Sequence, residues 1–236
     1  MRNYFLSFNS FFIVAVIHLI AILSGDALNW LVVSTKPMLL FFLLIIFYFQ
    51  TASSAGIFKK LVLTALLFSW LGDILLLFQQ WDANFFLAGL ISFLAAHVCY
   101  ILAFRKTSLH HEQTFLKEEP WLILLFLGYG IMFFFLIRNG LGDMLMPVMA
   151  YMVVILLMGI TALNRFRRVE NHSFLWVFAG ALCFMMSDSL LAINKFSHPF
   201  PMAGFFIMLT YVAAQYLIVK GSLRQIEAEK GKSVGN

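Results

Sequence analysis

The sequence predicts an all-α polytopic membrane protein with eight transmembrane helices, and its composition, its apolar runs and its charge distribution each favour this fold class. Of the 236 residues, 62% are hydrophobic and only 11% are charged, whereas an average soluble domain is about 45–50% apolar and about 25% charged. A soluble core of this size could not bury so much apolar side chain. The composition therefore excludes a soluble globular protein.

Eight mostly apolar runs fill most of the chain, and each approaches the roughly 20 residues that a membrane-spanning helix needs. We expect these spans at residues 5–23, 37–56, 61–79, 84–104, 121–137, 144–163, 174–193 and 201–220. The second span is expected to begin after Lys36-Pro37, because proline lacks the N–H that is unpaired in the first turn of a helix. The first run has a poor signal-peptide cleavage site, so a retained helix is expected.

The distribution of Lys and Arg predicts the orientation, because cytoplasmic loops carry an excess of these residues. With a cytoplasmic N-terminus, 13 of the 16 Lys and Arg residues lie on the inner side, and only Lys36, Arg138 and Lys195 lie on the outer side. We therefore expect both termini in the cytoplasm, a polar inner loop at Thr107–Glu119 and a charged cytoplasmic tail at residues 222–236. For a bacterial protein, the membrane would be the cell inner membrane.

Asp73 and Asp188 are the carboxylic acids that fall inside the predicted spans. An ionisable side chain in a spanning helix costs at least about 2.5–3.5 kcal/mol on insertion scales, which makes each acid a functional candidate. The helical rise places both acids at a similar depth, roughly 7–10 Å below the outer ends of their helices. Two carboxyls facing one cavity of low dielectric do not both ionise easily, so one can serve as an acid and the other as a carboxylate.

An offset of 115 residues aligns Asp73 with Asp188 without a gap, and it also aligns Phe85 with Phe200 and Ala88-Gly89 with Ala203-Gly204. We interpret this as an internal duplication, with repeats at residues 1–106 and 120–221. An even number of spans in each half gives parallel repeats, which are related by an axis along the membrane normal. The two acids would then face each other, and Tyr100 would lie opposite Gln215.

Further polar residues in the spans suggest a pocket around the acids. His97 and Tyr100 share one face of the fourth span, while Tyr211 and Gln215 share one face of the eighth. We expect these four side chains to orient the acids and water, although an intramembrane His or Tyr is often only a packing or interfacial residue. At the outer rim, three residues are candidates for contact with a phosphate headgroup, although snorkelling explains the two lysines equally well. They are Lys36, Asn194 and Lys195.

No metal, cofactor or nucleic-acid partner is expected. A zinc site needs three or four His, Cys or carboxylate ligands, and no such set accompanies His97 in the predicted spans. The sequence contains no GxxxxGK[ST], GxGxxG or HExxH motif. The net charge of +5 is spread over short clusters between apolar runs and forms no basic face for a nucleic acid.

Taken together, these residues resemble the YhhN family of membrane proteins, which includes the animal lysoplasmalogenases. The resemblance covers nearly the whole chain, with one departure at Val212, where a second tyrosine is expected after Tyr211. The matching segments are Lys36-Pro37, Leu71–Leu76, Phe86–Phe93 with His97 and Tyr100, Ser187–Phe196, and Thr210-Tyr211 with Ala214-Gln215. The resemblance implies an eight-helix hydrolase that acts on lysoplasmalogens, which are membrane lysophospholipids. It would cleave their vinyl ether bond to give a fatty aldehyde and a glycerophospho-base. Asp73 and Asp188 would then be the catalytic acids.

Two other function classes remain open. A metal-dependent membrane lipid hydrolase, acting on an amide or ester, would recruit His97 together with the acids and would lose activity on chelation. A carrier of lipids or small molecules is the second alternative, because paired acids near a repeat axis also suit proton-coupled transport. Such a carrier would bind its ligand without releasing a product.

Overall fold

The structure is a computed structural model that describes residues 8–106 and 115–234. Within these ranges, seven helices are long and apolar enough to cross a membrane, and a shorter apolar helix precedes them. The described residues contain no strand. The all-α, multi-pass membrane fold predicted from the sequence is therefore confirmed, while the cytoplasmic location of the termini stays a prediction.

The seven long helices and the shorter helix that precedes them correspond one by one to the eight predicted spans. A short helix, α5 (Phe115–Glu118), lies in the loop expected at Thr107–Glu119. Residues 107–114 of this loop and residues 5–7 of the first predicted span lie outside the described residues. The shorter helix is α1 (Phe8–Leu23), and the long helices are α2 (Asn29–Gln50), α3 (Ile57–Leu77), α4 (Ala83–Arg105), α6 (Leu122–Ile137), α7 (Leu145–Leu163), α8 (Asn171–Phe196) and α9 (Ala203–Val234).

The second span differs most from its prediction, because α2 begins at Asn29 and contains Pro37 in its interior. Membrane helices tolerate an internal proline where neighbouring groups satisfy the backbone. At this position the indole Nε1 of Trp70 in α3 donates to the carbonyl of Pro37 itself at 2.9 Å, which ties α2 to α3. The predicted start after Lys36-Pro37 is therefore wrong, and Lys36 lies inside a helix instead of at its rim.

The last helix is longer than the predicted span 201–220, because α9 continues to Val234. Leu223 and Ile226 are both buried in the core, so tertiary packing extends the helix beyond the apolar run. The segment expected as a tail at residues 222–236 is thus helical as far as Val234. Its cytoplasmic location stays a prediction, and residues 235–236 lie outside the described part of the chain.

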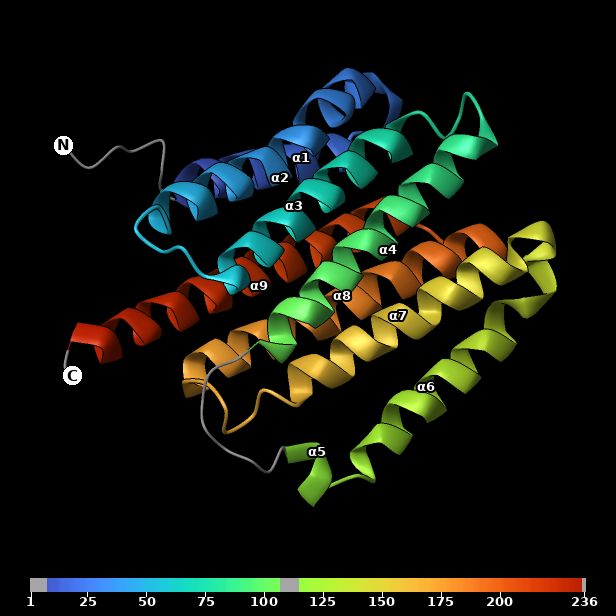
Figure 1. The fold of residues 1–236 in the computed structure, drawn as a ribbon. Helices are drawn as coiled ribbons and strands as arrows, with labels where there is room; N and C mark the ends of the chain where they lie inside the picture. The colour runs from blue at the N-terminus through green and yellow to red at the C-terminus, as the bar shows by residue number, and fades with distance from the viewer. Residues whose placement is uncertain (1–7, 107–114, 235–236) are drawn as a thin grey trace.

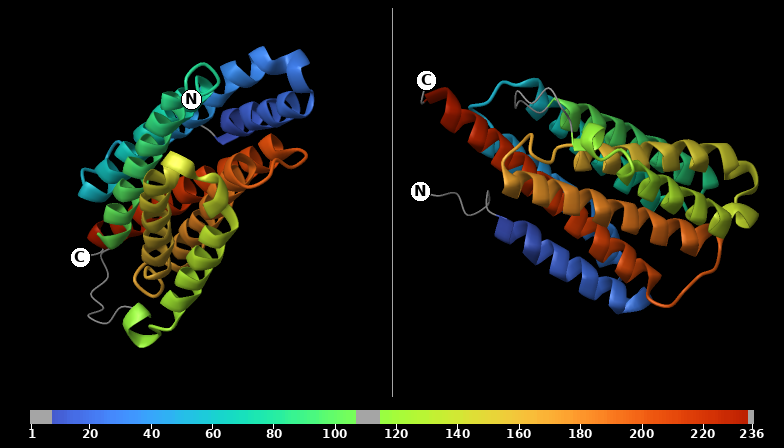
Figure 2. Two further views of the ribbon diagram at one scale, coloured as in Figure 1. Left: turned by 90° about the vertical axis from the view of Figure 1, so that its right-hand side faces the viewer. Right: turned by 90° about the horizontal axis from the view of Figure 1, so that it is seen from below.

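The helices form one bundle in which α3 packs on α4 and α8 packs on α9 most extensively. Helix α4 also contacts α7, and α2 contacts α9, which joins the N-terminal and C-terminal groups of helices. Helix α6 lies at one edge of the bundle and α1 at the opposite edge (Figures 1 and 2). Helix α1 begins and α9 ends at the same end of the bundle (Figure 1).

Glycines bring the backbones of α8 and α9 into direct contact. A Cβ atom at Gly180 would lie 2.9 Å from the carbonyl oxygen of Ala214, and one at Gly221 would lie 2.9 Å from the carbonyl oxygen of Ser173. Small residues allow such close approach of helices in a membrane, where packing rather than hydrophobic burial drives helix association. This tight pair holds Asp188 on α8 in a fixed position relative to Tyr211 and Gln215 on α9.

Candidate active site

Asp73 and Asp188 line the same cavity, which has a volume of about 120 Å³. Asp73, on α3, is only 2% exposed, and the side chain of Asp188, on α8, is 16% exposed. Lys36 from α2, Tyr151 from α7 and Tyr211 from α9 also line the cavity. Residues from five helices thus converge at the place where the sequence predicts the two acids to face each other.

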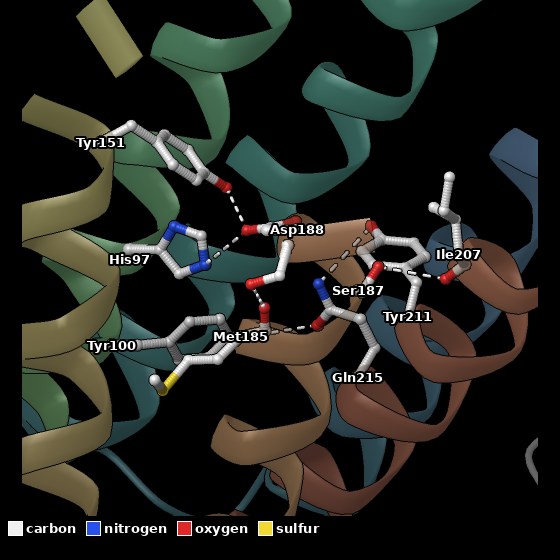
Figure 3. A network of polar contacts seen from close by, with 10 residues as sticks. His97, Tyr100, Tyr151, Met185, Ser187, Asp188, Ile207, Tyr211 and Gln215 are labelled. Atoms are coloured by element: carbon white, nitrogen blue, oxygen red, sulfur yellow. Dashed lines mark hydrogen bonds and ion pairs between the residues drawn. The ribbon is translucent and has the colours of Figure 1, made fainter. Parts of the chain in front are cut away.

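A chain of hydrogen bonds leads to Asp73. Tyr100 donates to Oε1 of Gln215 at 3.0 Å, the Nε2 amide of Gln215 donates to the Tyr211 hydroxyl at 3.5 Å, and Tyr211 donates to Oδ2 of Asp73 at 2.8 Å. Every donor in this chain points towards the carboxyl, so the bonds polarise one another in one direction. Figure 3 shows Gln215 between the two tyrosines. Tyr100 and Gln215 are 115 residues apart and in contact, as the offset predicts.

Asp188 has a different set of neighbours. The hydroxyl of Tyr151 donates to its Oδ2 at 2.5 Å, and Nε2 of His97 lies 4.0 Å from the same oxygen. The His97 ring packs edge-on against Tyr151 and Phe184. Figure 3 shows Tyr151 and His97 approaching the carboxyl from the same side. Of the predicted site residues, His97 is therefore placed at Asp188, and Tyr100, Tyr211 and Gln215 are placed at Asp73.

Lys36 is half-buried and lines the cavity. Its ammonium group interacts electrostatically with the carboxyl of Asp73. An opposite charge nearby favours the ionised form of an acid. The structure therefore brings Lys36 to the acids, whereas the sequence analysis placed it at the outer rim because it took Pro37 for the start of a helix.

Asn194 and Lys195 do not line the cavity. Oδ1 of Asn194 accepts a hydrogen bond from the backbone N–H of Phe200 at 3.4 Å. Lys195 is exposed, and its Nζ lies 4.0 Å from the ring centre of Phe86, which does line the cavity. Lys195 is therefore near the edge of the site, and the predicted contact of both residues with a phosphate stays a prediction.

The sequence analysis missed Tyr151, which donates to Asp188, and also Tyr129 and Ser189, which are hydrogen-bonded to each other in the cavity wall. A tyrosine in an apolar run has no distinctive local pattern. One signal for Tyr151 was present: the offset of 115 residues that aligns the acids also aligns Tyr151 with Lys36. The structure places both of these residues in the cavity wall, each from the helix that precedes an acid-bearing helix.

The residues around the acids can be compared with the ligand sets of metal sites. In residues 8–106 and 115–234, no group of three or more His, Cys, Asp or Glu side chains is placed to hold a metal. The polar groups that surround Asp73 and Asp188 are mainly hydroxyl, amide and ammonium donors. Such donors stabilise carboxylates by hydrogen bonding.

The fold and the site together define a class: a polytopic helical membrane protein that holds a pair of carboxyl groups in a cavity inside the bundle. Comparison with known proteins then identifies the lineage. The chain belongs to the YhhN family, whose sequence pattern matches residues 31–222. The resemblance inferred from the motifs is thereby confirmed.

Several named relatives are similar over most of the chain. Lysoplasmalogenase TMEM86B of Homo sapiens is 31% identical over 199 residues, which are 84% of this chain and 78% of the relative. Lysoplasmalogenase TMEM86A of Bos taurus is 31% identical over 170 residues, 70% of this chain and 66% of the relative. Lysoplasmalogenase of Mycobacterium tuberculosis is 29% identical over 163 residues, 69% of this chain and 60% of the relative. No solved structure matches the chain.

Proposed function

We propose that this protein is a membrane hydrolase that cleaves the vinyl ether bond of lysoplasmalogens and releases a fatty aldehyde and a glycerophospho-base. The observation that carries the proposal is the pair of carboxyl groups, Asp73 and Asp188, in one cavity inside the membrane-spanning bundle. The names of the relatives from animals and mycobacteria support the substrate class.

Vinyl ether hydrolysis suits two carboxyl groups with different protonation states. A carboxylic acid donates a proton to the carbon of the double bond that is remote from the ether oxygen, which produces an oxocarbenium ion. A carboxylate stabilises this cation and directs water to it, as paired carboxylates do in glycoside hydrolysis. The resulting hemiacetal breaks its bond to the glycerol oxygen, which takes up a proton and leaves as the glycerophospho-base, while the aldehyde forms.

The surroundings of the two acids support an assignment of these roles. Both acids accept a hydrogen bond from a tyrosine, so this bond does not distinguish them. The ammonium of Lys36 does, because its charge acts on Asp73 and favours a carboxylate there. Asp188 has the tyrosine hydroxyl of Tyr151 and the imidazole of His97 beside it. We assign the carboxylate role to Asp73 and the proton-donor role to Asp188.

The remaining predicted residues have supporting roles in this proposal. Tyr100 and Gln215 hold Tyr211 in position through the hydrogen-bond chain. Lys36 at the cavity wall and Lys195 with Asn194 near its edge contact the phosphate of the substrate. A water molecule between the acids completes the reaction, and no metal or cofactor takes part.

The first experiment measures aldehyde release from a lysoplasmenyl lipid by the purified protein in detergent. General acid–base groups contribute about 100- to 10,000-fold to a rate, so Asp73→Asn and Asp188→Asn should each lose at least about 100-fold. Asp143→Asn, an exposed acid in the turn between α6 and α7, is the matched control and should keep full activity.

The same experiment separates the alternatives. Activity that persists in chelator supports metal-free hydrolysis, and activity lost in chelator and restored by metal would support the metal-dependent class. Full activity in both Asp variants would contradict the proposed mechanism. Stoichiometric lipid binding by a folded protein that releases no aldehyde would support a carrier.

A further inference from the structure

The cavity that holds the acids is too small for a whole lysolipid. Its volume of about 120 Å³ is below the roughly 300–1,000 Å³ of typical small-molecule sites. The bond that the proposed reaction cleaves is at the first carbon of the hydrocarbon chain. The chain must therefore leave the cavity within a few carbons of the acids and lie against another part of the protein.

A second, larger hollow lies directly beside the cavity. It has a volume of about 740 Å³ and is formed by α6 and α8, with Leu163 at the end of α7. Its walls are almost entirely apolar and include Leu125 from α6 and Met186 from α8. We call this hollow the α6–α8 groove. Its volume lies within the range of ligand sites, and its lining contains no charged side chain and matches a hydrocarbon.

The groove and the cavity share three wall residues, Tyr129, Met185 and Ser189. The Ser189 hydroxyl donates its single hydrogen to the carbonyl of Met185 at 2.6 Å. In the hydrogen bond between Tyr129 and Ser189, the tyrosine is therefore the donor. One hydrogen bond between α6 and α8 thus crosses the boundary between the acids and the groove.

The groove is open to the lipid phase. Leu125 is 60% exposed and Met186 is 49% exposed, and α6 stands at the edge of the bundle, as Figures 1 and 2 show. A lipid chain can therefore reach the groove sideways from the membrane without passing through the headgroup region.

We propose that the α6–α8 groove binds the hydrocarbon chain of the substrate and that the chain reaches the acids between Tyr129 and Ser189. This inference rests on the proposed function for the identity of the lipid. The occupant is the chain of a membrane lipid, because the groove is apolar, faces the lipid phase and is continuous with the cavity where the chain must begin. The Tyr129 side chain moves away from Ser189 when the chain is in place.

The first test fills the groove. Met186→Trp places a bulky ring in it, while Met132→Trp is the matched control, because Met132 is an exposed methionine of α6 outside the groove lining. With a chain of about 16 carbons, Met186→Trp should lower kcat/KM about tenfold, equivalent to roughly two lost methylene contacts. With a chain of about 6 carbons it should change little, and Met132→Trp should change neither. Leu125→Trp, on the opposite wall, should repeat the effect if the first variant does not fold.

The second test does not depend on turnover. A saturated ether lysolipid that carries a photoreactive diazirine at the end of its chain is cross-linked to the Asp188→Asn protein, and the adducts are mapped. We expect adducts in residues 122–129 and 178–190, the two segments that contribute most of the groove lining. Adducts confined to other helices, or equal effects of Met186→Trp and Met132→Trp on the long-chain substrate, would overturn the inference. Adducts in the groove of a protein that cleaves no lysoplasmenyl lipid would support the groove and contradict the proposed function.

Discussion

Each acid in the site receives a hydrogen bond from a buried tyrosine, and this donor holds the carboxyl in one orientation. Tyr211 donates to Asp73, and Tyr151 donates to Asp188. A hydrogen bond to a charged group contributes about 1.5–3 kcal/mol, and a buried group left without its partner loses its solvation as well. The two tyrosines therefore fix the orientation of the carboxyls at a site that water cannot fully solvate.

The hydroxyl groups of the two tyrosines can be tested by removing them. Tyr211→Phe and Tyr151→Phe should each lower kcat about 10- to 100-fold, the equivalent of about 1.5–3 kcal/mol, with little change in KM, because each removes a hydroxyl that acts on an acid. Aldehyde release under steady-state conditions measures both constants. Tyr48→Phe is the control, since Tyr48 is 51% exposed and lies outside the cavity lining. A large rise in KM with unchanged kcat would contradict a role on the acids.

The chemistry of single residues explains which part of the site was predictable. An acid in an apolar run is costly, so Asp73 and Asp188 stand out from the sequence alone. Tyr151 does not stand out, because a tyrosine is common in membrane helices and only its position relative to Asp188 gives it a role. Lys36 was predicted as a site residue, but its place in the cavity wall with Asp73 depends on the path of α2, which the sequence did not reveal.

At the scale of helices, hydropathy predicted where the spans lie, and tertiary packing decided where they end. A proline at position 37 is equally compatible with a helix start and with the interior of a membrane helix, and α2 has it in the interior. The end of α9 was missed for a related reason, because buried Leu223 and Ile226 extend the helix into a charged segment.

The contact between α8 and α9 leads to the second prediction. Gly180→Ala and Gly221→Ala would each place a Cβ atom 2.9 Å from backbone atoms of the partner helix, which side-chain motion cannot relieve. Such overpacking costs about 1–3 kcal/mol, so each variant should lower the midpoint of thermal unfolding in detergent. Gly128→Ala in α6 is the control, because a Cβ there meets nothing within 4 Å. Its midpoint should be unchanged or slightly raised by the better helix propensity of alanine.

At the scale of the whole molecule, the arrangement around the acids supports the proposed duplication. Asp73 in the first half is contacted by Tyr211 from the last helix of the second half. Asp188 in the second half is approached by His97 from α4, the last helix of the first half. The contacts between helices follow the same pattern: α4 of the first half packs on α7 of the second, and α9 of the second half packs on α2 of the first. Each half thus completes the site of the other, which a twofold axis between the halves would produce.

If such an axis exists, it passes between Tyr100 and Gln215, because equivalent residues of two repeats touch only where they meet the axis. Exchanging the two side chains should then preserve their hydrogen bond.

Tyr100→Gln and Gln215→Tyr should each lower the thermal midpoint, because both residues are fully buried and one hydrogen bond is worth about 1 kcal/mol. The double exchange should recover most of the loss, giving a coupling energy of about 1 kcal/mol in a double-mutant cycle. A double variant whose loss equals the sum of the single losses would argue against the axis, as would an experimental structure in which residues 1–106 fail to superpose on residues 120–221.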